Sequence, residues 1–147
     1  FSTVNFRLGN VYGPRQRPDL ESGVISIFTE KINNQESLVL FGHGKASRDY
    51  IYVSDVVEAF KIASGLEFKG EVFNLGTGID TKVEEVMDCL VKCLGKEPSG
   101  VEKLPLRPGE LDRISLSSTS FYKKTGWKPI FSLQDGIALF VDSILKK

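Results

Sequence analysis

The chain has 147 residues, of which 41% are hydrophobic and 10% aromatic, so it is long enough to form a globular domain with a sizeable core. Nineteen basic residues balance nineteen acidic ones, and this balance gives no support for electrostatic binding to nucleic acid or to an anionic membrane. No apolar run approaches the roughly 18 residues that cross a bilayer, so we expect a soluble, cytoplasmic protein.

The first predicted element is a strand over residues 2–8, followed by a loop with two glycines and two prolines over residues 9–18. Loops at the carboxyl ends of strands in an α/β sheet are where ligands bind. By position, the candidates are Asn10, Tyr12, Arg15 and Arg17. On these residues alone, a solvated basic turn is the favoured interpretation.

A helix follows over residues 23–33, with residues 24, 25, 28 and 32 on one apolar stripe. Residues 38–41 form a short strand that leads into a turn at Gly42 and Gly44. Arg48 and Asp49 then stand where this turn becomes a strand with alternating faces, before a helix from Asp55 to Ser64 that Ser54 is expected to cap.

The guanidinium of Arg48 offers a planar fork of donors to a phosphate or a carboxylate, and Asp49 is placed to hold that fork in position. The alternative is a surface ion pair at the start of a strand, with no function in binding. These residues alone leave both interpretations open.

Residues 71–75 form another strand, followed by Gly76-Thr77-Gly78 and a helix over residues 83–94 with a capping box at Thr81–Glu84. A strand, a Gly-x-Gly turn and a helix outline a phosphate site, but the third glycine of a dinucleotide fingerprint is missing and we predict none here. We expect this strand to lie parallel to the strand at 2–8, within a doubly wound sheet covered on both faces.

The remaining segment is extended through three prolines over residues 97–109, and these restrict the chain around Arg107. A short helix at 119–125 stops at Gly126, and Ser132 caps a last helix. The two cysteines, Cys89 and Cys93, lie on successive turns of one helix and are predicted to be reduced thiols. No metal site is expected from the spacing of His and Cys residues.

Five motifs occur in order along nearly the whole chain. They are RLGNVYGPRQ at 7–16, FGHGKASRDYIYVSD at 41–55, VFNLGTG at 72–78, RPGE at 107–110 and GWKP at 126–129. Together they resemble the extended short-chain dehydrogenase/reductase family of nucleotide-sugar epimerases and dehydratases, and within it the UDP-glucose 4-epimerases most closely.

The resemblance implies an α/β fold in which residues 1–147 are a single fragment, the C-terminal, substrate-binding portion of an extended Rossmann-like enzyme. In this family the NAD-binding fingerprint and the catalytic Tyr-x-x-x-Lys pair come earlier than the strand that opens this sequence. None of the four tyrosines here is followed by lysine four residues later. We therefore expect no catalytic residue, no NAD-binding part and no turnover in this chain alone.

The resemblance also implies a role for each site residue. Arg48 and Arg107 would clamp a diphosphate between separate loops, with Tyr50 beside it, and must then approach each other in the fold. The other expected contacts are the amide of Asn10, a nucleobase wall at Val39–Phe41, and a ribose or base partner at Glu110. Departures from the family pattern at Leu8, Gly9, Glu110 and Leu116-Ser117 leave the identity of the sugar open.

The function implied for the full-length protein is NAD-dependent 4-epimerisation of a UDP-sugar, carried out by a homodimer. One alternative is a nucleotide-sugar 4,6-dehydratase or decarboxylase of the same family. Another is a non-catalytic binding or assembly module in which both arginines form structural ion pairs.

Overall fold

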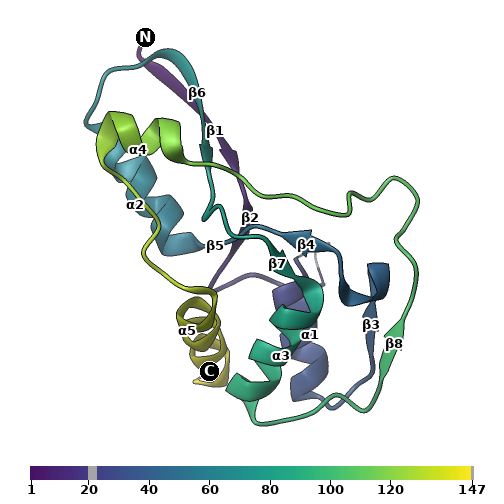
Figure 1. Cartoon of the computed structure of the whole chain (residues 1–147). Helices are drawn as coiled ribbons and strands as arrows, with labels where there is room; N and C mark the ends of the chain where they lie inside the picture. The colour runs from purple at the N-terminus through teal and green to yellow at the C-terminus, as the bar shows by residue number, and fades with distance from the viewer. Residues whose placement is uncertain (20–22, 147) are drawn as a thin grey trace.

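Strands and helices are interspersed along the chain, and the strands pair two by two (Figure 1). The structure is a computed structural model that describes residues 1–19 and 23–146. Its strands are β1 (Thr3–Leu8), β2 (Asn10–Tyr12), β3 (Leu38–Leu40), β4 (Ser47–Arg48), β5 (Tyr50–Tyr52), β6 (Lys69–Leu75), β7 (Thr81–Lys82) and β8 (Val101–Lys103). Its helices are α1 (Val24–Asn33), the 3-10 turn η1 (Phe41–Gly44), α2 (Val53–Ser64), α3 (Val83–Leu94), α4 (Thr119–Thr125) and α5 (Leu133–Leu145). The pairs β1–β6, β2–β5 and β3–β8 are parallel, whereas β4–β7 is antiparallel.

β1 and β6 lie side by side with Phe6 opposite Phe73, which confirms the parallel pairing predicted for these two strands. The Phe6 ring lies 4.9 Å from the Phe60 ring of α2 and 5.3 Å from the Phe121 ring of α4, measured between centroids. α2 and α4 thus cover one face of the pair. On the other face Val72 is 50% exposed, so cover on both faces is not provided by the described residues of this chain.

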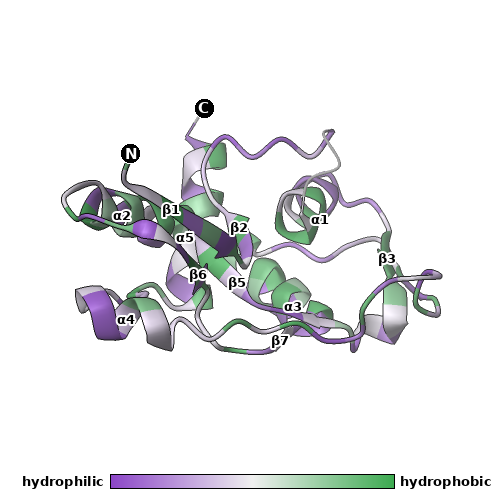
Figure 2. Ribbon diagram, turned by 90° about the horizontal axis from the view of Figure 1, so that it is seen from above, coloured by the Kyte–Doolittle hydropathy of each residue, from purple (hydrophilic) through white to green (hydrophobic). Residues whose placement is uncertain are grey.

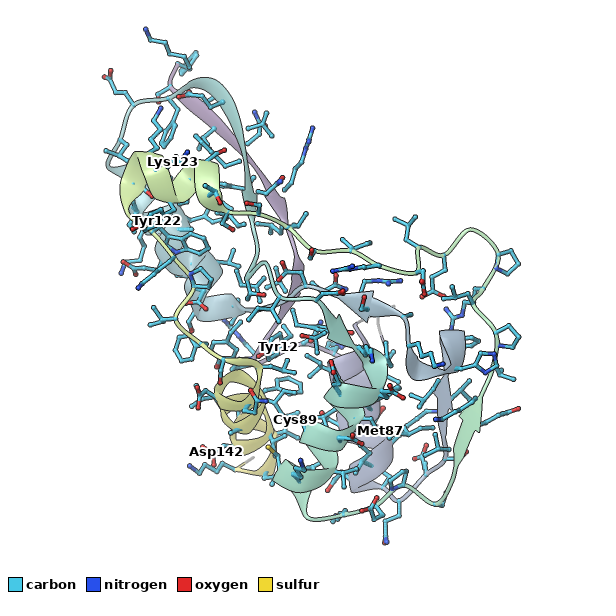
Figure 3. All side chains as sticks on the ribbon, in the orientation of Figure 1. Tyr12, Met87, Cys89, Tyr122, Lys123 and Asp142 are labelled. Atoms are coloured by element: carbon cyan, nitrogen blue, oxygen red, sulfur yellow. The ribbon has the colours of Figure 1, made fainter. Side chains whose placement is uncertain are left out.

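A second core lies between α1, α3 and α5, where Ile32, Leu90 and Phe140 are fully buried. Tyr12 and Cys89 lie between α3 and α5 in Figure 3 and belong to the same core. Figure 2 shows hydrophobic and hydrophilic residues on both α2 and α3, as expected for helices with one buried face.

β5 joins the two cores because its side chains alternate between the faces of the strand. Tyr50 and Tyr52 belong to the core formed with α1, α3 and α5, whereas Ile51 packs with α2 and α4. The alternation predicted from the sequence is therefore confirmed.

Two helix starts differ from the prediction. Tyr52, not Ser54, occupies the N-cap of α2, and no side chain caps that helix. At α3 the capping carboxylate is Glu85, which accepts the N–H of Lys82 at 2.8 Å, so the predicted box is shifted by one residue and Thr81 lies in β7. β5 runs directly into α2 and β7 runs directly into α3. The last residue of each strand therefore occupies the N-cap of the helix that follows.

Other termini follow the sequence signals. Gly95 ends α3 and Gly126 ends α4, both in the left-handed conformation that glycine adopts without strain. The hydroxyl of Ser132 accepts the N–H of Asp135 at 3.1 Å and caps α5 as predicted. β8 was not predicted, because it pairs with a strand some sixty residues earlier in the chain.

Both cysteines are free thiols, with Cys89 buried and Cys93 exposed. Among the described residues no group of His, Cys, Asp or Glu side chains could hold a metal ion. Within the same residues, every helix is too short or too polar to cross a bilayer.

Candidate functional site

Residues 104–114 run from β8 toward α4 as an extended segment, which we call the strap (Figure 1). At its start, the N–H of Leu104 donates to the carbonyl of Leu40 at 3.0 Å. At its end, the N–H of Ser47 donates to the carbonyl of Asp112 at 2.9 Å, and the N–H of Ile114 returns to the carbonyl of Ser47 at 3.2 Å. The strap therefore lies over β3, η1 and β4, the region where the sequence places most of the site.

A tight turn forms the middle of the strap. The N–H of Glu110 donates to the carbonyl of Arg107 at 3.0 Å, and Gly109 has a φ of 80°. Proline at the second position and glycine with positive φ at the third are typical of a type II turn. Arg107 and Glu110 are thereby fixed at the two ends of one turn.

A cavity of about 480 Å³ lies between the strap, α1 and β3. Its lining is apolar except for three charged side chains, and consists of Val24, Ile27, Phe28, Lys31, Val39, Phe41, Ala46, Val83, Arg107 and Glu110. The Arg107 guanidinium carbon lies 3.9 Å from the centroid of the Phe41 ring, a cation–π contact. Four residues singled out in the sequence, Val39, Phe41, Arg107 and Glu110, therefore line one cavity.

Arg48 lies at the same turn. Its Nη2 is 3.1 Å from Oε1 of Glu110, and its Nη1 donates to the carbonyl of Ser47 at 2.8 Å. The Arg48 side chain is only 14% exposed. The fold thus brings Arg48 and Arg107 to one turn of the strap, and Glu110 is the carboxylate that partners Arg48.

Asp49 does not hold the Arg48 fork, contrary to the prediction. It is fully buried, and its carboxylate accepts hydrogen bonds from the N–H and hydroxyl of Thr77 and from the N–H groups of Gly78 and Leu116, at 2.7–3.0 Å. A Cβ on Gly76 would lie 2.6 Å from Oδ2 of Asp49, so glycine is required there. Asp49 therefore joins the loop after β6 to the segment before α4.

Asn10 and Tyr50 occupy opposing positions of β2 and β5 and line a neighbouring cavity of about 290 Å³. Burial raises the pKa of the Tyr50 hydroxyl to about 12, so it stays protonated at neutral pH. The structure does not place these two residues in the cavity that contains Arg107, but Tyr50 follows Arg48 by only two positions.

The Gly76-Thr77-Gly78 loop does not fit a dinucleotide phosphate. The N–H groups of Thr77 and Gly78 donate to Asp49, and the N–H of Gly76 donates to the hydroxyl of Ser118 at 2.8 Å. A phosphate cradle needs free N–H groups at this position. These three N–H groups are therefore not free to hold a dinucleotide phosphate.

α1 contributes four side chains to the cavity that contains Arg107, and the sequence did not predict this contribution. Val24 and Phe28 were assigned only to a core-facing stripe, and Ile27 and Lys31 were not considered. Helical periodicity identifies the buried face of a helix but not whether part of that face meets a cavity. No local signal in the sequence distinguishes the two.

Comparisons with known proteins identify the family of this chain. Residues 1–76 match the NAD dependent epimerase/dehydratase family. A UDP-glucose 4-epimerase of Mycolicibacterium smegmatis is 40% identical over 138 residues, which cover 94% of this chain and 44% of that protein. A dTDP-4-dehydro-6-deoxyglucose reductase of Escherichia coli is 32% identical, over 97% of this chain and 45% of the reductase.

Solved structures of UDP-glucose 4-epimerases have the same fold as this chain over nearly all of its length. UDP-glucose 4-epimerase of Thermotoga maritima, determined with UDP-glucose, superposes with a TM-score of 0.87 at 41% identity, over 97% of this chain and 46% of that one. The Thermus thermophilus UDP-glucose 4-epimerase complex with NAD superposes with a TM-score of 0.86 at 38% identity, over 98% and 47%. The chain spans less than half the length of these proteins.

Proposed function

Because this chain belongs to the NAD dependent epimerase/dehydratase family, we propose that it is the nucleotide-sugar-binding portion of a UDP-sugar 4-epimerase. The observation that carries the proposal is the strap turn, which holds Arg107 beside an apolar cavity and Glu110 against Arg48. Arg107 lines the apolar cavity, and Arg48 lies at the same turn through its pair with Glu110. Two guanidinium groups placed in this way are suited to a ligand with a charged diphosphate and a flat, less polar base.

In this proposal each side chain has one task. Arg48 and Arg107 neutralise the diphosphate and donate paired hydrogen bonds to it, and Tyr50 lies beside them. Val39 and Phe41 form the apolar wall for the nucleobase. Glu110 accepts from the ribose or base, and the amide of Asn10, in the neighbouring cavity, contacts the ligand from the end of its strand.

The hydride chemistry of 4-epimerisation belongs to bound NAD in the full-length protein. The Tyr-x-x-x-Lys pair and the cofactor fingerprint do not occur in residues 1–147. We therefore propose that this chain binds the substrate and positions it, and that it does not turn it over alone. The full-length protein is proposed to be a cytoplasmic homodimer.

The solved relatives support a nucleotide-sugar ligand, because one was determined with UDP-glucose. A 4,6-dehydratase or decarboxylase of the same family would bind a similar ligand. A non-catalytic module would not bind such a ligand. Under this alternative, the ion pair between Arg48 and Glu110 would have a structural role only.

Calorimetric titration of the chain with UDP tests the proposal. We expect saturable binding that is much weaker for uridine, because uridine lacks the diphosphate. The double variant Arg48→Ala/Arg107→Ala should lose the preference for UDP. Arg7→Ala is the matched control, since Arg7 is exposed on β1, outside the strap and its cavity. No binding by the unmodified chain at millimolar UDP would refute the proposal and favour the non-catalytic module.

A further inference from the structure

The guanidinium of Arg48 already has two acceptors within the chain. Nη1 donates to the carbonyl of Ser47 at 2.8 Å, and Nη2 lies 3.1 Å from a carboxylate oxygen of Glu110. With a side chain only 14% exposed, Arg48 has little surface left for another partner. The guanidinium has five N–H groups in all, but so little of the side chain is accessible that an anion binding at Nη2 must take the place of Glu110.

Glu110 is the acceptor that can leave. The carbonyl of Ser47 also accepts the N–H of Ile114 at 3.2 Å and belongs to β4, so it is fixed by the backbone. Glu110, by contrast, lies between the two anchored ends of the strap. Among the described residues, the only backbone–backbone hydrogen bond made by residues 105–111 is the one inside the turn itself, from the N–H of Glu110 to the carbonyl of Arg107. The turn can thus shift without breaking backbone bonds to the rest of the chain.

Resting on the proposed role of Arg48 as a phosphate ligand, we infer that Glu110 is an internal competitor for the anion. Its carboxylate occupies the donor that a phosphate oxygen needs, and binding exchanges one charged acceptor for another. The exchange lowers affinity for every anion. It lowers affinity most for ligands too weakly charged to displace a carboxylate, so Glu110 contributes to selection of a diphosphate.

Inorganic pyrophosphate is the appropriate probe, because it lacks the ribose and base that Glu110 is proposed to contact once a nucleotide is bound. Glu110→Asp keeps the charge but shortens the side chain by one methylene, which separates it from Arg48. Glu110→Gln removes the charge. Glu102→Gln, on the exposed strand β8, is the control for loss of one negative charge near the site.

We expect both substitutions of Glu110 to tighten pyrophosphate binding by about three- to fivefold, the range for a partly exposed ion pair. Glu102→Gln should leave it unchanged. In an Arg48→Ala background the substitutions of Glu110 should have no effect, because the contested donor is gone.

Pyrophosphate binding that is absent in every variant, or equal or weaker when Glu110 is replaced, would overturn the inference. A gain for Glu110→Gln but not for Glu110→Asp would also overturn it, since that pattern reports general charge and not the contact. The proposed function fails separately, if UDP binds no tighter than pyrophosphate in the unmodified chain.

Discussion

Asp49 shows how one buried carboxylate can connect segments that are distant in the sequence. It accepts four hydrogen bonds, from Thr77, Gly78 and Leu116, and is fully buried. Buried donors that lose their acceptor cost about 1–3 kcal/mol each. Asp49, which follows the proposed phosphate ligand Arg48 in the sequence, therefore contributes mainly to stability.

Asp49→Ala should lower the free energy of unfolding by about 3 kcal/mol or more, because three backbone N–H groups lose their acceptor. Urea denaturation followed by circular dichroism measures the change. Asp142→Ala, which removes only an exposed pair with Lys146, should shift it by less than about 1 kcal/mol. Equal losses for the two variants would contradict the structural role of Asp49.

The two arginines give a second prediction for single residues. Arg48→Ala and Arg107→Ala should each weaken UDP binding by about 1.5–3 kcal/mol, the contribution of a charged hydrogen bond. Lysine at either position should restore only part of the affinity, since it keeps the charge but loses the planar fork. Calorimetry on the four variants decides this, and full affinity in any alanine variant would remove that arginine from the clamp.

Both cysteines lie on α3, but Cys89 is buried and Cys93 is exposed. Burial, and to a lesser extent the neighbouring Cys93, raises the pKa of the Cys89 thiol to about 11. Since only the thiolate is nucleophilic, Cys89 stays protonated and unreactive near pH 8, and its reactivity should rise only as pH approaches its pKa. Cys93 is exposed on the next turn.

We expect one equivalent of Ellman's reagent to react rapidly with the folded chain at pH 8 and the second only after denaturation. Cys93→Ser should abolish the fast phase, and Cys89→Ser should leave it intact. Two equivalents reacting at one rate would mean that the face of α3 bearing Cys89 is open to solvent.

The N-terminus of α5 depends on a single cap. Ser132 accepts the N–H of Asp135 at 3.1 Å and donates its own hydroxyl to the Asp135 carboxylate at 2.6 Å. Ser132→Ala should therefore lower the free energy of unfolding by about 1 kcal/mol. Ser132→Thr, which can accept the same N–H and donate to the same carboxylate, should recover most of it. Thermal denaturation of the two variants side by side tests this.

For the whole molecule, the described residues leave one face of the β1–β6 pair uncovered and pair with neither of its outer edges. Val72 on the uncovered face is 50% exposed, Leu8 at the end of β1 is 42% exposed, and within the described residues β1 pairs with no strand except β6. An open strand edge beside apolar side chains favours association between copies. We expect the isolated chain to form dimers or larger species in sedimentation velocity at high concentration.

Val72→Lys should reduce this association, because it places a charge on the uncovered face without removing a buried contact. Leu139→Lys is the control, since Leu139 is 44% exposed on α5, in the part of the molecule with the second core. A chain that stays monomeric at every concentration would show that the open face of β1–β6 is not sufficient for self-association.

Features that depend on near neighbours could be predicted from the amino-acid sequence. Alternation along β5, glycine at the ends of α3 and α4, and Ser132 at the start of α5 could each be predicted within a few residues. The motifs led to the family because they are short, ordered strings. The parallel pairing of β1 and β6 was also accessible, since two apolar strands that each end in glycine-rich loops are typical of an α/β sheet.

The partners of the charged side chains, by contrast, depend on how distant segments meet in the fold. Asp49 was expected beside Arg48 because the two are adjacent in the sequence, yet Asp49 lies between β4 and β5 and its buried carboxylate accepts hydrogen bonds from the loop after β6. Arg48 instead meets Glu110, 62 positions later, and Asp49 meets Thr77 and Leu116. Such contacts depend on where the strap and the loop after β6 return to the sheet, and no local pattern encodes that distance.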